Sequence, residues 1–87
     1  MSLNQHRNQI DAIDSQMVKL LNERLKHALA IGKIKLEQGG SIYAPHREKA
    51  VFDRVCALNE GPLPDDSLRA IYREIMSAAI SLEKPVS

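Results

Sequence analysis

The chain has 87 residues, which is enough for one small domain with a single hydrophobic core. Its 12 basic and 11 acidic side chains give a formal net charge of +1, and 3% of the residues are aromatic. This balance disfavours nucleic acid or an anionic membrane as the main partner, because both favour a strongly basic surface. The single cysteine, Cys56, excludes an internal disulfide and fits a cytoplasmic location. No apolar run is long enough to span a membrane, and we expect no secretory signal.

The first predicted element is a helix over about residues 3–38. A stripe of residues three and four positions apart follows the spacing of one helical face. Its members are Ile10, Ile13, Met17, Leu20, Arg24, His27, Ile31 and Ile34. Gly39 and Gly40 are expected to end the helix, because glycine pairs favour turns. Gly32 weakens the helix unless close packing or a ligand requires its missing side chain.

Two shorter helices are predicted over about residues 45–59 and 66–83. Pro45 suits a first helical position, where its missing N–H is harmless, and Pro85 marks the end of the last helix. The segment from Gly61 to Pro64 is a clear break between them. No strand-like alternation is present. The predicted fold class is therefore all-α, with three helices forming one domain over residues 1–87.

The length of the first helix predicts a second copy of the chain. A helix of about 35 residues would span roughly 52 Å, whereas a compact domain of this size is about 30 Å across. The apolar stripe runs along most of that length and must be covered. Two chains that share their long helices in an intertwined homodimeric bundle would cover it. The alternative is a monomer whose helix breaks near Gly32 and folds back.

Several charged residues lie where a purely structural core would have none. Arg24 occupies a position in the stripe where Leu or Ile is expected, and Lys35 lies close to the same face about three turns later. Buried cations are costly unless an anion meets them, and arginine binds carboxylates in a bidentate manner. We therefore expect an anion-binding pocket in the bundle. The candidate charged residues are Arg7, Arg24, Lys35, Arg47, Glu48 and Glu83.

Apart from Glu83, which is late in its helix and poorly placed for the helix dipole, each of these residues also has a structural interpretation. Arg7 can be a solvated surface residue, and Arg24 can pair with an acid of a partner chain. Lys35 can lay its aliphatic stem along the apolar face. Arg47 and Glu48 can form a surface pair, and His27 is expected to be a partly buried packing residue. The histidines and the cysteine have no metal-binding spacing, and no cofactor motif is present, so we expect neither a metal nor a cofactor.

Ordered sequence blocks over nearly the whole chain resemble a known family. The blocks are Arg7–Asp14, Leu20–Arg24, Ile31–Lys35, Pro45–Glu48, Asn59–Leu63 and Ile71–Ala79. Together they resemble the all-helical class of chorismate mutase. The closing blocks are most similar to the N-terminal mutase domain of bifunctional chorismate mutase/prephenate dehydratase proteins.

The resemblance implies a homodimer with two equivalent sites, each taking its first arginine from the other chain. Arg7 and Arg24 would bind the carboxylates of chorismate, with Arg47 in support, and Glu48 would hold the ring hydroxyl. Lys35 and Glu83 would approach the ether oxygen from two sides. Arg24, Lys35 and Glu83 are thus the implied catalytic residues. The implied substrate-binding residues are Arg7, Arg47, Glu48, Ile31, Met76 and Ala79.

The reaction implied is the pericyclic rearrangement of chorismate to prephenate in phenylalanine and tyrosine biosynthesis, which needs no metal or cofactor. Three alternatives remain at this point. The first is an isochorismate pyruvate-lyase of the same fold, and the second is a non-catalytic helical dimerisation or regulatory module. The third is a plain structural coiled coil, for which Arg24→Leu would stabilise the dimer without loss of function.

Overall fold

The computed structural model describes residues 1–41 and 44–83, and this part of the chain forms three helices and no strands. They are α1 (Leu3–Glu37), α2 (Pro45–Leu58) and α3 (Asp65–Glu83). The all-α prediction is confirmed, and each helix boundary lies within one residue of the expected position. Pro85, expected to mark the end of the last helix, lies outside the described residues.

Both ends of α1 are closed by local hydrogen bonds. At the start, the Ser2 hydroxyl accepts from the Gln5 backbone N–H (3.1 Å), and the Gln5 side chain accepts from the Ser2 backbone N–H (2.7 Å). At the end, Gly39 has a φ of +74° and donates to Leu36, while the following Gly40 donates to the Lys35 carbonyl at 2.7 Å. The helix is continuous through residue 32, so the alternative of a break near Gly32 is wrong.

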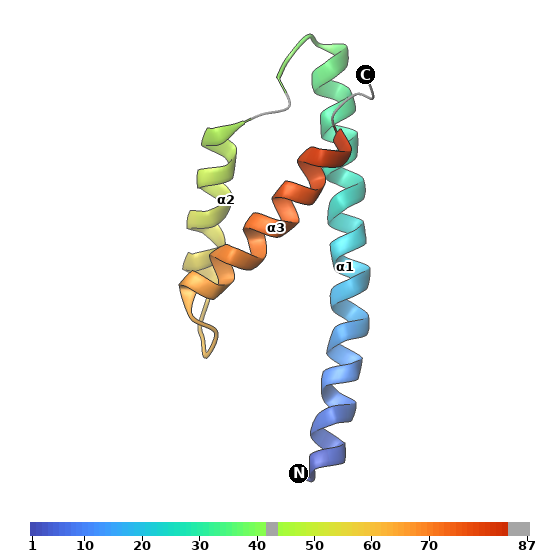
Figure 1. Cartoon of the computed structure of the whole chain (residues 1–87), viewed down its shortest axis with the longest axis vertical. Helices are drawn as coiled ribbons and strands as arrows, with labels where there is room; N and C mark the ends of the chain where they lie inside the picture. Colours follow the sequence, from blue (N-terminus) through green and yellow to red (C-terminus); the bar gives the residue numbers. More distant parts are fainter. Residues whose placement is uncertain (42–43, 84–87) are drawn as a thin grey trace.

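The turn between α2 and α3 is held by one side chain. The Asn59 amide donates to the Leu63 carbonyl (2.7 Å) and to the Asp65 carboxylate (2.8 Å), and its oxygen accepts from the Gly61 N–H (3.0 Å). Pro45 occupies the first position of α2, as expected. These contacts turn the chain so that α3 runs back diagonally between α2 and α1 (Figure 1).

The helix α3 is the central element, since it packs against both α1 and α2, whereas α1 and α2 have no direct packing in the described part of the chain. The buried side chains of this core are only Val51 of α2 and Met76 and Ala79 of α3. The chain measures 55 × 23 × 18 Å, and its radius of gyration is 16.1 Å. A compact chain of this length would have about 12 Å.

The first half of α1 projects beyond the rest of the chain (Figure 1), and every residue from 1 to 23 is exposed. Its stripe faces water, with Ile10, Ile13 and Met17 each at least half exposed (56%, 52% and 50%). An apolar stripe of this length in water is unfavourable and marks an interaction surface. Within residues 1–41 and 44–83, no helix is both long and apolar enough to cross a membrane.

Candidate functional site

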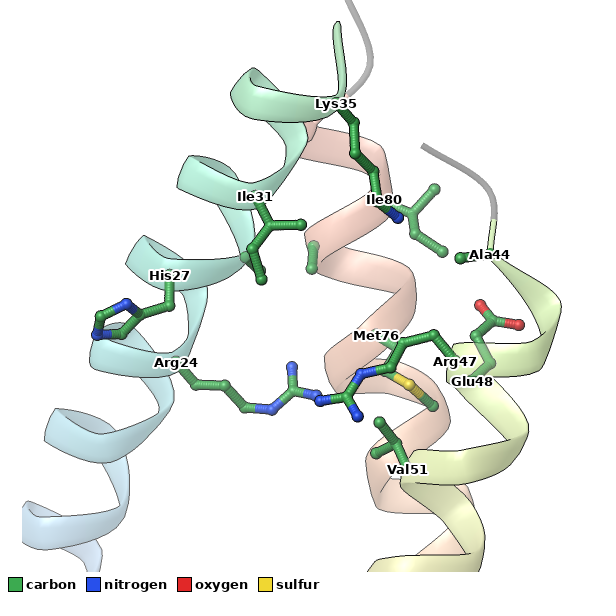
Figure 2. A pocket seen from close by; sticks show the side chains of 12 residues that line it. Arg24, His27, Ile31, Lys35, Ala44, Arg47, Glu48, Val51, Met76 and Ile80 are labelled. Carbon is green, nitrogen blue, oxygen red and sulfur yellow. The ribbon is translucent and has the colours of Figure 1, made fainter. Parts of the chain in front are cut away.

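A pocket of about 240 Å³ lies where the second half of α1 faces α2 and α3 (Figure 2). All three helices contribute to its wall. The lining residues are Arg24, His27, Ala28, Ile31, Lys35, Ala44, Arg47, Glu48, Val51, Met76, Ala79 and Ile80.

Most of the expected site residues meet at this pocket. The helical spacing of α1 places Arg24, Ile31 and Lys35 along one side, because seven and eleven residues are close to whole numbers of turns. The first turn of α2 brings Arg47 and Glu48 to the opposite side, where Figure 2 shows the Arg24 and Arg47 side chains pointing toward one another. From α3, Met76 and Ala79 form the floor.

The charge in this pocket is predominantly positive. Three cations, Arg24, Lys35 and Arg47, line it together with a single carboxylate, Glu48. The ion pairs within the described residues are Lys49–Asp53 and Arg69–Asp66, both on the surface, so none of the pocket cations is neutralised by an ion pair there. Cations gathered around a half-enclosed cavity favour an anionic ligand.

Arg24 has an aromatic partner that the sequence did not indicate. Its guanidinium lies over the Tyr72 ring, 5.8 Å from the ring centroid, and the Arg24 side chain is half-buried. A cation above an aromatic face is attracted by the negative charge of the ring face. The ring of Tyr72 therefore supports the Arg24 guanidinium. Its N–H groups form no ion pair with an acidic side chain of the described residues.

The apolar wall of the pocket contains the buried apolar side chains of the described residues. Val51, Met76 and Ala79 are 8%, 8% and 4% exposed, so they form a firm surface against which a ligand can be held. Sequence reasoning missed Ala28 and Ile80 as lining residues. Helical spacing contained the signal for both, since Ala28 is one turn after Arg24 and Ile80 is one turn after Met76.

Glu83 lies beside the pocket rather than in its lining. Its side chain crosses Gly32 of α1, where a Cβ built on the glycine would come within 2.9 Å of the Glu83 Cγ. Burial raises the pKa of the Glu83 carboxyl above its ordinary value, and the positive charge of Lys35 partly offsets this rise. The carboxyl group thus lies near enough to Lys35, which lines the pocket, to feel its charge.

Arg7 is the other expected site residue that does not line the pocket of its own chain. It precedes Arg24 by seventeen residues on the same helix, so the two residues are about 25 Å apart along the helix axis. The prediction that it serves the site of a second chain stays a prediction.

His27 is exposed at the pocket rim with its ring pointing away from the other labelled side chains (Figure 2), so the expectation of a partly buried residue is wrong.

Fold and site together define a small three-helix protein with a cation-lined pocket and an uncovered long helix. Residues 6–84 match the family described as chorismate mutase type II, and the chain therefore belongs to this family.

The chain is 49% identical over 82 residues to the bifunctional chorismate mutase/prephenate dehydratase of Neisseria gonorrhoeae, covering 94% of this chain and 22% of that protein. The bifunctional protein of the same description from Aquifex aeolicus is 43% identical, with 97% of this chain and 24% of that protein covered. The chain thus spans less than a quarter of the length of these two relatives.

Solved structures agree with this assignment. Chorismate mutase (Form II) from Thermus thermophilus superposes with a TM-score of 0.90 at 32% identity, covering 93% of this chain and 92% of that one. Chorismate mutase from Helicobacter pylori in complex with prephenate gives a TM-score of 0.83 at 32% identity, with 93% and 88% covered.

Proposed function

We propose that this chain is a chorismate mutase domain, which as a homodimer converts chorismate to prephenate. The observation that supports this most is the set of pocket cations, Arg24, Lys35 and Arg47, none of which has an ion-pair partner in the described part of the chain. Chorismate is a dianion, and two arginine forks suit its two carboxylates. The family and the prephenate complex of the Helicobacter pylori relative support the same substrate.

The reaction breaks the ether C–O bond of the substrate while a new C–C bond forms within the same molecule. The protein must hold the substrate in the folded conformer that brings the two reacting carbons together. Arg24 and Arg47 would fix the carboxylates and Glu48 the ring hydroxyl. The floor of Met76 and Ala79 would press against the folded substrate, with Ile31 at the rim.

Negative charge grows on the ether oxygen as its bond to carbon breaks, and preordered donors must meet it. The Lys35 ammonium would donate from the α1 side. Glu83 would donate from the α3 side, and only its protonated form can do so. The raised pKa of Glu83 supports this role, because burial favours the protonated carboxyl. Mutational loss of one such donor costs on the order of 10²–10³ in rate.

The exposed stripe of α1 supports the dimer, since a second copy would cover Ile10, Ile13 and Met17. In this arrangement Arg7 would enter the pocket of the partner chain and complete its carboxylate site.

We place the protein in the cytoplasm, where its single thiol, Cys56, would stay reduced.

The direct test is loss of chorismate absorbance with purified protein, together with prephenate formation. We expect turnover by the wild type and a loss on the order of 10²-fold or more with Arg24→Ala, since a bidentate carboxylate contact is removed. Tight chorismate binding without turnover would instead identify a non-catalytic module. Pyruvate release from isochorismate at a higher kcat/KM would identify the lyase.

A further inference from the structure

One contact between α1 and α3 is not explained by core packing. Gly32 is the only buried residue among those of α1, and the three atoms nearest to a Cβ built there all belong to Glu83. The Glu83 side chain lies over it instead: a Cβ at position 32 would be 2.9 Å from Cγ, 3.2 Å from Cβ and 3.2 Å from Cδ of Glu83. Real Cβ atoms essentially never come this close, so any side chain at position 32 would displace Glu83.

A glycine at this position is unfavourable for the helix itself. In the interior of a helix, glycine is about 1 kcal/mol less favourable than alanine. Gly32 is in the last third of α1, its φ is not positive, and the helix is continuous around it. Backbone conformation therefore does not require glycine here. The open slot that its missing side chain leaves for Glu83 is the remaining structural reason.

The slot determines where the Glu83 carboxyl lies. Gly32 is on the same face of α1 as Ala28 and Lys35, both of which line the pocket. A carboxyl that crosses the helix at this point is half-buried and feels the charge of Lys35, yet no ion pair joins the two among the described residues. The Glu83 carboxyl therefore acts on Lys35 through its charge without a direct ion pair between these two described residues.

We propose that Gly32 is a positioning residue, whose absent side chain seats Glu83 across α1 so that its carboxyl faces the reacting atoms from beside Lys35. This inference rests on the proposed function for its consequence in catalysis, but the seating of Glu83 stands on geometry alone. Lys35 is the charged group of α1 that acts on Glu83, and Arg47 and Glu48 of α2 lie across the pocket.

The test is Gly32→Ala, which improves helix propensity and so separates positioning from stability. We expect a folded protein with unchanged or higher thermal stability and a kcat lower by on the order of 10²-fold, as for a displaced catalytic group. KM should change much less, because the carboxylate-binding arginines are untouched. Ala30→Gly is the matched control: it changes helix propensity in the opposite direction at an exposed position two residues away, and should leave kcat unchanged.

Two further measurements distinguish positioning from a general defect. In a Glu83→Ala background, the methyl group that Gly32→Ala adds meets only the Cβ at position 83 and displaces no carboxyl. Gly32→Ala should therefore cause little additional loss of kcat in this background. Carboxyl NMR titration should show the pKa of Glu83 falling toward its ordinary value in Gly32→Ala, since burial is the larger cause of its rise. This titration needs no substrate, so it remains decisive even where the wild type fails to turn over chorismate.

An unchanged kcat and an unchanged Glu83 pKa in Gly32→Ala would overturn the proposal, as would an equal loss in the Glu83→Ala background. Should Gly32→Ala fail to fold, Glu83→Asp replaces it, because it keeps the carboxyl but withdraws it by one methylene. A loss of kcat comparable to that of Glu83→Ala would then support the proposal, and wild-type kcat would contradict it.

Discussion

The two halves of α1 share one sequence pattern, but only the second half packs on another helix of the chain. From Arg24 onward the helix packs on α3 and lines a pocket, whereas every residue before Arg24 is exposed. The stripe nevertheless continues through both halves with the same spacing. In the second half the stripe is only partly covered: Arg24 is half-buried, whereas Ile31 and Ile34 are 53% and 51% exposed, much like the stripe of the first half. The homodimer proposed above would cover the exposed stripe in both halves.

The largest expected effect comes from charging the uncovered half. Ile13→Lys places an ammonium where we expect the partner chain to pack, and each buried unpaired ion costs several kcal/mol. We expect the dimer to weaken by about three orders of magnitude or more and activity to fall with it. Sedimentation equilibrium, with activity measured over a dilution series, reports both.

Ser15→Lys is the matched control, because it introduces the same side chain two residues away on the opposite face of α1. It should leave the oligomeric state and turnover unchanged. Equal behaviour of the two variants would mean that the stripe is not the contact surface. The halves of α1 would then differ for another reason.

The next effect tests whether the two halves work in different sites. Arg7→Ala and Lys35→Ala should each reduce kcat/KM on the order of 10²-fold or more, as homodimers. Mixed and refolded together, half of the dimers would be hybrids, each with one site that has both residues. Activity should then recover to about a quarter of the wild-type value. An absence of recovery would place Arg7 in the site of its own chain or outside the site.

The sequence was sufficient for the helices because their ends have local causes. The glycines after α1, the proline that starts α2 and the prolines before α3 act within a few residues, so the boundaries lie within one residue of expectation. Helical spacing likewise brought Arg24 and Lys35 to one face. Local rules decide both features.

Contacts between helices were harder to predict, because they depend on how α3 crosses α1. Periodicity placed Tyr72 and Glu83 on the apolar side of α3 but could not show that one lies under Arg24 and the other over Gly32. Gly32 was open to two interpretations: it either simply weakens the helix or permits a close contact with another group. The predicted role of Arg7 belongs to the homodimer and stays a prediction.

A smaller effect concerns pH in the packed half. The pKa of Glu83 is raised, so in the folded protein the carboxyl is protonated and able to donate below this pKa and is ionised above it. Activity should therefore fall roughly tenfold per pH unit above the pKa of Glu83. Glu83→Gln donates at every pH and should flatten the kcat profile, so that it overtakes the wild type in alkaline buffer. A variant with the same alkaline decline would assign the pH dependence to another group.

The smallest expected effect lies at the boundary between the halves, at Arg24, the first half-buried residue of α1. Its guanidinium is supported by the Tyr72 ring at 5.8 Å, an interaction worth about 0.5–1 kcal/mol at a partly exposed site. Tyr72→Leu removes the ring face and should raise KM for chorismate by about two- to fivefold with little change in kcat. Tyr72→Phe keeps the ring and should retain the wild-type KM. Since both variants keep an apolar side chain of similar reach, an equal rise in KM would show that the hydroxyl, not the ring, orients Arg24.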